Sequence, residues 1–333
     1  MQLIEYISAL IGGFVLITWG ADRFVLGASA TARNFGISPL LIGLTIVGLG
    51  TSAPEILIAV EASIAGKTDM ALGNAVGSNI TNILLVLGIT AIVVPISIRS
   101  EILRREFPIL FAVMLLFYIL IGDQHISRLD GVILVGGLVI MLYWVINLGL
   151  NRSKKDPIAA EYDAEIPKGM SNAMAIFWLL AGMVILIASS KLLVWGASEI
   201  ARYAGVSELM IGLTIVALGT SMPELAASVM SALRNEPDIA IGNVIGSNMF
   251  NLLAVACMPG LIHPSAIDPS LLDRDVIIMV IVTLGLFAMS YGFRGQGRIT
   301  RMEGILLLSG FIGYQIMLYF DEVVKTGAAI AAV

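Results

Sequence analysis

Long apolar segments separated by short polar breaks make up most of this chain. The breaks are charged residues or short stretches rich in Pro and Gly. A helix needs about 20 residues to cross the hydrocarbon core of a bilayer. The pattern therefore predicts ten membrane-spanning helices, at about residues 6–32, 38–63, 71–96, 107–122, 130–150, 172–201, 207–232, 239–262, 275–293 and 303–320.

One long polar stretch, residues 151–171, divides the chain nearly in half. We expect a first five-span half at residues 1–150, a loop at 151–171 and a second half at 172–333. With the first residue outside, the cytoplasmic connections carry twelve Lys and Arg and the outer ones five. Because basic residues gather on the cytoplasmic side, this count predicts a cell membrane protein with both termini outside and the 151–171 loop inside.

Composition agrees with a bilayer environment and excludes several classes of protein. Apolar residues make up 58% of the 333 residues and charged residues 13%, about half the usual share in soluble domains. The net charge of −5 gives no basic surface for nucleic acid, and the single Cys257 cannot form an internal disulfide. No nucleophile–base set or H-E-x-x-H motif indicates an enzyme, and we infer neither a cofactor nor an obligatory protein partner.

The chain contains an internal repeat. Residues 24–55 match residues 193–224 at 21 of 32 positions, at an offset of 169, and the same offset relates 73–82 to 242–251. Since each half has an odd number of expected spans, the second half should enter the membrane the opposite way up. Inverted repeats are typical of transporters with a central site, although a channel can also be built from repeats.

Each repeat places one glutamate, Glu55 or Glu224, near the middle of an apolar span. A carboxylate at that depth costs several kcal/mol, on the order of 3. No Lys or Arg lies near the middle of the spans that carry the two motifs. The remaining solutions are protonation, which is itself a route to proton coupling, and a bound cation, which we favour over a purely structural role.

The residues beside the two glutamates supply oxygen atoms. Pro54 and Pro223 lack an N–H and clash with the carbonyl four residues back, so they should bend the helix and free the carbonyls of Gly50 and Gly219. The neighbouring hydroxyls belong to Thr51, Ser52, Thr220 and Ser221. Six to eight oxygens are what Ca²⁺ prefers, and the lack of a soft ligand nearby argues against copper or zinc.

A second motif, GNxxGSN, adds amides and hydroxyls. Ser78 and Asn82 are four residues apart, as are Ser247 and Asn251, so each pair shares one helix face. Side-chain oxygens on that face can complete a cation shell. Four more asparagines fit helix-to-helix hydrogen bonding as well as ligation: Asn74, Asn79, Asn243 and Asn248.

With GTSxPE followed by GNxxGSN in both halves, the chain resembles the calcium/cation antiporter superfamily, specifically the prokaryotic sodium/calcium exchangers. The resemblance covers nearly the whole length. It implies an all-α integral membrane protein of ten helices, arranged as two inverted five-helix repeats around a central group of four cation sites. It also implies alternating access, in which the first and sixth spans slide past the site.

The resemblance further implies a ligand set for the transported ions Ca²⁺ and Na⁺. Glu55 and Glu224 would be shared acidic ligands, Thr51 and Thr220 would serve calcium, and Asn82 and Asn251 would complete the middle. The oxygens implied for sodium are those of Ser52, Ser78, Ser221 and Ser247 and the carbonyls of Gly48 and Ala217.

One position departs from some relatives, in which Asp stands where this chain has Asn251. The departure points away from potassium dependence and leaves proton coupling open. The expected function is therefore Ca²⁺/Na⁺ exchange; the alternatives are Ca²⁺/H⁺ exchange on the same scaffold and, as a different class, a cation channel. Three charged residues inside expected spans, Asp22, Arg23 and Lys191, favour a local ion pair or snorkelling toward the interface.

Overall fold

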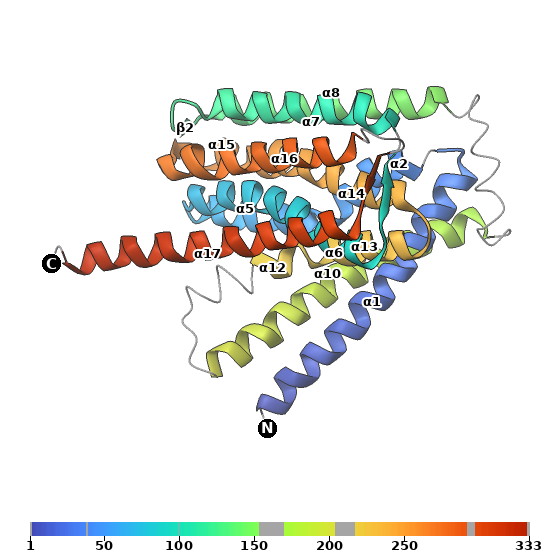
Figure 1. The fold of residues 1–333 in the computed structure, drawn as a ribbon, viewed down its shortest axis with the longest axis horizontal. Coiled ribbons are helices and arrows are strands. Elements are labelled where there is room, and N and C mark those ends of the chain that lie inside the picture. Colours follow the sequence, from blue (N-terminus) through green and yellow to red (C-terminus); the bar gives the residue numbers. More distant parts are fainter. Residues whose placement is uncertain are drawn as a thin grey trace.

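The structure of the chain is a computed structural model. It describes residues 2–37, 39–98, 100–152, 170–203, 217–291 and 297–331. Most of the expected 151–171 loop and the first part of the expected span at 207–232 lie outside these residues. The described residues are mostly helical and form a bundle of roughly aligned helices, with two long helices packed at an angle against it (Figure 1).

Helices of the first half run in short, broken segments between longer ones. They are α1 (Gln2–Asn34), α2 (Pro39–Ile42), η1 (Gly43–Val47), α3 (Gly48–Thr51), α4 (Ala53–Ile64), α5 (Thr68–Thr81), η2 (Asn82–Leu87), α6 (Gly88–Val93), α7 (Ser100–Leu120) and α8 (Arg128–Arg152). The η segments are π-helical turns, which add a residue to the helical repeat and occur frequently at functional sites.

Helices of the second half follow a similar order. They are α10 (Asn172–Tyr203), α12 (Ala217–Thr220), α13 (Met222–Leu233), α14 (Pro237–Phe250), η4 (Asn251–Val255), α15 (Cys257–Ile262), η5 (Leu271–Val276), α16 (Ile277–Ser290) and α17 (Arg301–Ala331). The π-helical turns η2 and η4 begin at Asn82 and Asn251, which the offset of 169 relates.

Six described helices are long and apolar enough to cross a bilayer, and a bent pair makes a seventh. Two expected spans are not among these helices. The span at 107–122 corresponds to a shorter apolar helix from Glu106 to Leu120, and the span at 275–293 is divided between η5 and α16. The chain is thus a helical membrane protein, and the count of ten spans stays a prediction.

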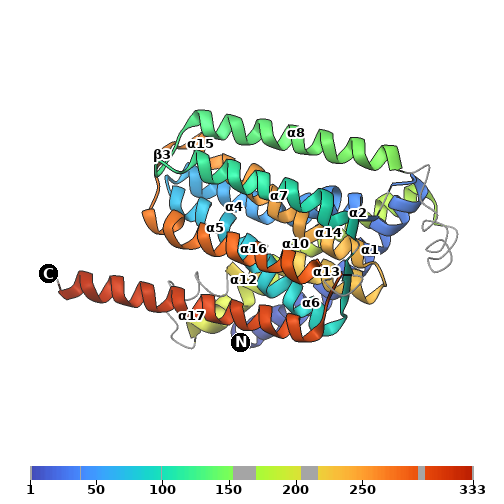
Figure 2. The same cartoon turned by 45° about the horizontal axis from the view of Figure 1, so that its top comes forward.

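Two spans form the centre of the bundle. The apolar window of the span at Pro237–Ile262 is 100% buried within the protein and that at Thr68–Val93 is 78% buried, whereas those at Leu3–Asn34 and Arg128–Val145 are 22% buried. Figure 2 shows α8 along one edge of the bundle, with α7 beside it. The two central spans carry the GNxxGSN motifs, so the second motif of each half lies in the protein interior.

The helix that carries each glutamate is broken immediately before it. Ser52 (φ −80°, ψ 5°) and Ser221 (φ −86°, ψ 4°) leave helical geometry, and Pro54 and Pro223 follow in the first turns of α4 and α13. The bend between Gly43–Thr51 and Ala53–Ile64 is 49°. Proline is tolerated in the first helical turn, because the N–H groups there have no intrahelical acceptor. The predicted bend is therefore confirmed for the first half.

Helices α1 and α10 lie side by side and extend away from the rest of the bundle (Figure 1). Glycines allow their backbones to touch: a Cβ added at Gly27 would lie 2.3 Å from the backbone nitrogen of Leu179, and one at Gly182 would lie 2.6 Å from the Cα of Phe24. Small residues at such contacts let membrane helices approach closely. The two helices therefore pack against each other as an antiparallel pair.

The expectation of an all-α protein is correct for the spans but misses two short antiparallel ribbons in the connections. Strand β1 (Ile96–Ile98) pairs with β4 (Gly297–Ile299), and β2 (His125–Ile126) pairs with β3 (Ser265–Ala266). Each ribbon joins a strand of the first half to one of the second. With two or three residues per strand, they lie below the length at which alternation of apolar residues signals a strand.

Candidate cation site

The two glutamates predicted to bind a cation lie in the first turns of α4 and α13, and both are buried. Glu55 is 1% exposed and Glu224 is 0% exposed. The carboxylates lie near enough for like-charge repulsion, and Ser52 Oγ donates to Glu224 Oε1 at 3.4 Å. Ser52 belongs to the GTSxPE segment of the first half and Glu224 to that of the second half. The two GTSxPE segments therefore meet at one place in the fold.

Several oxygens around this meeting point are buried without a hydrogen-bond partner among the described residues. They are Oε1 and Oε2 of Glu55, Oε2 of Glu224, Oδ1 of Asn82, Oδ1 of Asn251 and Oγ of Ser221. A buried oxygen without a partner costs about 1–3 kcal/mol, and more when it is charged. A cation bound beside such oxygens would offset this cost.

The donor chemistry suits a hard cation. Across the described ranges, no cluster of three or more His, Cys, Asp or Glu is placed to hold a metal ion. A cation bound here would therefore rely on two carboxylates together with neutral amide and hydroxyl oxygens. Such all-oxygen sets suit Ca²⁺ or Na⁺ rather than copper or zinc.

The amides of Asn82 and Asn251 make matching hydrogen bonds across the centre. Asn82 Nδ2 donates to Asn248 Oδ1 at 3.1 Å, and Asn251 Nδ2 donates to Asn79 Oδ1 at 3.1 Å. The offset of 169 relates Asn82 to Asn251 and Asn79 to Asn248, so the two hydrogen bonds are equivalent in the repeat. In both, the NH₂ group is engaged with the facing helix and the carbonyl oxygen of the same amide is left unpaired.

Two further asparagines support the backbone at the glutamates. Asn243 Nδ2 donates to the carbonyl oxygen of Glu224 at 3.2 Å and to Ser228 Oγ at 2.9 Å. Asn74 Nδ2 lies 3.5 Å from the carbonyl oxygen of Glu55, at the limit for a hydrogen bond. Of the two roles left open for these asparagines, the observed contacts are helix-to-helix hydrogen bonds.

A third group of predicted oxygens lies between α3 and α14. Thr51 Oγ1 donates to Asn243 Oδ1 at 3.0 Å and lies 3.2 Å from Ser247 Oγ, which in turn donates to the carbonyl oxygen of Gly48 at 3.3 Å. A Cβ added at Gly48 would lie 3.0 Å from the backbone nitrogen of Ser247. Close approach of the two helices thus brings these predicted ligands together.

The remaining predicted ligands are placed less completely. Ser78 and Thr220 are buried, at 5% and 7% exposure. The backbone of Ala217 begins α12, while its side chain lies outside the described residues. The carbonyl of Gly219, expected to be free, accepts a hydrogen bond from Ser190 Oγ at 2.5 Å. Ser190 was missed because its equivalent under the offset is Ala21, so the repeat gave no signal.

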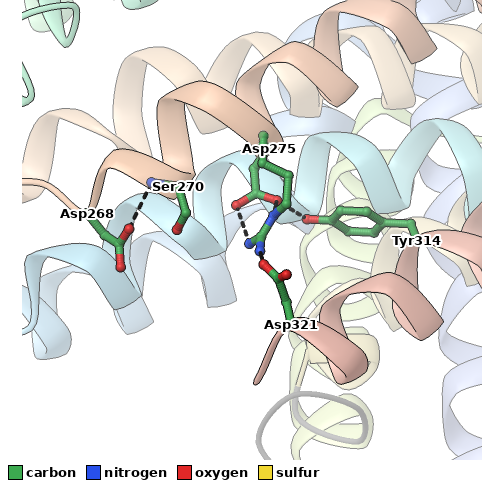
Figure 3. Close-up of polar contacts among 6 residues, drawn as sticks. Asp268, Ser270, Asp275, Tyr314 and Asp321 are labelled. Atoms are coloured by element: carbon green, nitrogen blue, oxygen red, sulfur yellow. Dashed lines mark hydrogen bonds and ion pairs between the residues drawn. The ribbon is translucent and has the colours of Figure 1, made fainter. Parts of the chain in front are cut away.

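Charged residues form separate clusters away from the glutamates. Arg274 pairs with Asp275 at 2.9 Å and also with Asp321, and Tyr314 Oη donates to Asp275 Oδ1 at 3.0 Å. Figure 3 shows Asp275 facing Tyr314 of α17, with Asp321 of the same helix on the other side of the guanidinium group. These contacts tie η5 to α17.

Charges inside the expected first span are also accounted for. Asp22 pairs with Arg234 at the end of α13, and the Arg23 guanidinium lies over the Trp178 ring, 4.9 Å from its centroid. Asp22 therefore forms an ion pair, but with a residue 212 positions away, so the expected local pair is wrong for Asp22. Arg23 is held by a cation–π contact at a tryptophan, a residue common at the membrane interface.

A buried pair of carboxylates among unpaired oxygens in a helical bundle defines a membrane protein that handles cations. The sequence matches the family described as sodium/calcium exchanger protein over residues 5–147 and 174–320. The chain belongs to this family of antiporters.

Individual relatives extend over nearly the whole chain. CaxA of Alkalimonas amylolytica, whose name assigns it provisionally to the antiporters, is 49% identical over 96% of this chain and 99% of its own. The inner membrane protein YrbG of Escherichia coli strain K12 is 40% identical over 94% of this chain and 96% of its own. A solved structure of the sodium–calcium exchanger NCX_Mj, soaked with Na⁺ and Ca²⁺, is similar with a TM-score of 0.79 and 33% identity, covering 93% of this chain and 97% of NCX_Mj.

Proposed function

We propose that this chain exchanges Ca²⁺ for Na⁺ by alternating access at a site centred on Glu55 and Glu224. The observation that carries the proposal is the group of buried oxygens without partners around these two glutamates. The similarity to NCX_Mj, which is named a sodium–calcium exchanger, supports the choice of ions. In this proposal the ten spans form two inverted repeats, at residues 1–150 and 172–333.

The charge of the site explains why exchange would be obligatory. Two carboxylates are neutralised by one Ca²⁺, and adding Na⁺ beside it would leave net positive charge in a site of low dielectric constant. Several Na⁺ ions could instead replace one Ca²⁺ by spreading over the flanking hydroxyl and carbonyl oxygens. An empty site would expose two bare carboxylates at the membrane midplane, which disfavours reorientation without a cation.

The proposed ligand set keeps every residue expected from the sequence. Glu55 and Glu224 are the shared acidic ligands, with amide oxygens from Asn82 and Asn251. Oxygens proposed for calcium and sodium come from Thr51, Thr220, Ser52, Ser221, Ser78 and Ser247 and from the carbonyls of Gly48 and Ala217. The burial of the described members of this set supports the assignment.

Proton coupling is the second candidate, favoured by one observation: both carboxylates are buried, so a proton on one would remove the cost of burying its charge. Uptake of radioactive Ca²⁺ into proteoliposomes separates the candidates. We expect an outward Na⁺ gradient to drive uptake and a pH gradient alone to fail. Uptake that follows the pH gradient and ignores Na⁺ would overturn sodium coupling in favour of H⁺.

A channel would behave differently in the same vesicles. Loaded vesicles placed in a medium without Na⁺, Ca²⁺ or a pH gradient should retain their Ca²⁺ if exchange is obligatory. Rapid loss under these conditions would overturn the antiporter proposal.

The proposed orientation has both termini outside and the 151–171 loop in the cytoplasm of a cell whose inner membrane holds the protein. Single cysteines introduced in this loop, in a variant lacking Cys257, should react with an impermeant maleimide only after the membrane is opened. Reaction in intact cells would reverse the proposed orientation and leave the site unchanged.

A further inference from the structure

Four asparagines form two crossed pairs at the centre of the bundle. Asn79 and Asn82 lie one turn apart around the junction of α5 and η2, and Asn248 and Asn251 occupy the same positions around the junction of α14 and η4. All four are buried, with exposures of 0–1%. We call them the asparagine brace.

The orientation of one arm of the brace follows from a backbone atom. Asn79 Nδ2 donates to the backbone carbonyl of Asn248 at 3.1 Å, and a carbonyl can only accept. The amide of Asn79 is therefore fixed, and its Oδ1 faces the Nδ2 of Asn251 at 3.1 Å. Asn251 must then present its own Oδ1 on the other side, where it lies buried and unpaired.

The second arm has the matching contact between side chains. Asn82 Nδ2 donates to Asn248 Oδ1 at 3.1 Å, and Asn82 Oδ1 is likewise buried and unpaired. The agreement of the two arms under the offset of 169 supports the amide orientation in both.

We propose that Asn79 and Asn248 are positioning residues: they hold the NH₂ groups of Asn251 and Asn82 away from the cation, so that the two carbonyl oxygens face it. The proposal rests on the proposed function, because it assumes that Asn82 and Asn251 contact the cation. A free asparagine amide can rotate by half a turn and present its NH₂ group, which repels a cation. The brace removes that alternative for both ligands.

The test measures equilibrium binding of radioactive Ca²⁺ to purified protein. Replacing Asn79 or Asn248 with leucine removes the acceptor for the partner amide. We expect each substitution to weaken Ca²⁺ binding by about 10–100-fold, as is typical for residues that orient a metal ligand. Equal binding by Asn79→Leu and the wild type would overturn the proposal.

Double substitutions separate positioning from a general loss of packing. Asn79 acts through Asn251, so Asn79→Leu added to Asn251→Leu should change binding by no more than about twofold. Asn79→Leu added to Asn82→Leu joins residues of different arms, so its effects should multiply. Multiplying effects in both combinations would indicate a structural role and overturn the assignment.

Two further variants keep the test informative if leucine disturbs the fold. Asn79→Asp keeps an oxygen acceptor for Asn251 Nδ2 and should retain tighter binding than Asn79→Leu; this advantage should disappear when Asn251→Leu is added. Met279→Leu is the matched control, because Met279 Sδ contacts Asn79 Nδ2 at 3.5 Å on the side away from the cation ligand. We expect its Ca²⁺ affinity to equal that of the wild type.

Ca²⁺ binding by the wild-type protein separates failure of the proposed function from failure of the positioning role. If the wild type binds no Ca²⁺, the proposed function fails and the brace has no ligand to orient. If the wild type binds Ca²⁺ and both leucine variants bind it equally well, the proposed function stands and the positioning role is wrong.

Discussion

The two halves of the chain are alike at the centre and different at the periphery. Asn82 and Asn251, which are equivalent under the repeat, make the same amide contact at the same 3.1 Å. Asp22 and its equivalent Lys191 carry opposite charges: Asp22 pairs with Arg234, whereas Lys191 is exposed. In the proposed function both halves present the same groups to one small ion, while each helix end meets different neighbours.

A second peripheral difference concerns the buried acids at the start of the fourth span of each half. Asp275 receives a hydrogen bond from Tyr314, while Glu106, its equivalent, has Val145 at the position equivalent to Tyr314. Valine has no hydroxyl to donate. The comparison suggests that substitutions at the centre should act equally in both halves and that substitutions at the periphery should not.

The largest effect should come from Glu55→Gln and Glu224→Gln. Each removes one of two formal charges while keeping the shape of the side chain, so both should abolish Ca²⁺ exchange in proteoliposomes. Glu61→Gln, on an exposed position of the same helix as Glu55, is the matched control and should leave transport unchanged. Transport by only one of the two site variants would break the equivalence of the halves.

The packing of α14 against the first half gives the next effect. A Cβ added at Gly246 would lie 2.5 Å from the carbonyl oxygen of Leu44. Because a backbone atom cannot yield easily, Gly246→Ala should cost about 1–3 kcal/mol of stability. Both the apparent melting temperature and the transport rate should fall.

The control for this substitution is Gly313→Ala. Gly313 is exposed on α17, and no described atom would lie within 4 Å of the added Cβ. A similar loss in both variants would show that helix composition, rather than contact with Leu44, sets the cost.

A smaller, pH-dependent effect is expected at Glu236, in the connection between α13 and α14. Burial raises the pKa of this carboxyl from 4.5 to about 7. The folded protein then holds a proton between these pH values that the unfolded chain releases. The group therefore lowers stability as pH rises from about 4.5 to about 7, and its full penalty is present above that range.

Glu236→Gln should remove this pH dependence. The variant should melt above the wild type at pH 8 and close to it at pH 4.5. Its equivalent, Lys67, is exposed, so Lys67→Gln is expected to leave the pH profile of the melting temperature unchanged. If the melting temperature of Glu236→Gln depended on pH as that of the wild type does, Glu236 would not be one of the differences between the two halves.

The smallest effect should follow from Asp22→Asn. The ion pair with Arg234 is about one third exposed, with side-chain exposures of 30% for Asp22 and 32% for Arg234. Such pairs contribute about 0.2–1 kcal/mol, so the melting temperature should fall by at most about 4 °C. The double variant Asp22→Arg with Arg234→Asp should recover part of the loss. Lys191→Gln should cause none, and an equal loss there would contradict the difference between the halves.

Several features of this protein were determined by the sequence alone. Helix breaks at Ser52 and Ser221 follow from the prolines two residues later, because proline clashes with the preceding turn and is best tolerated in a first turn. Burial of Glu55 and Glu224 was predictable from their position within apolar spans. The repeat at 169 residues also relates the candidate ligands of one half to those of the other.

Tertiary structure decided which partner each polar group meets. Asp22 pairs with Arg234, 212 residues away, although Arg23 is its neighbour in sequence, and the carbonyl of Gly219 is taken by Ser190. Likewise, only the packing of α5 with α14 brings Asn79 to Asn251. Adjacent residues on a helix point in different directions, and hydrogen bonds require about 3 Å, so partners depend on helix rotation and spacing that local sequence does not specify.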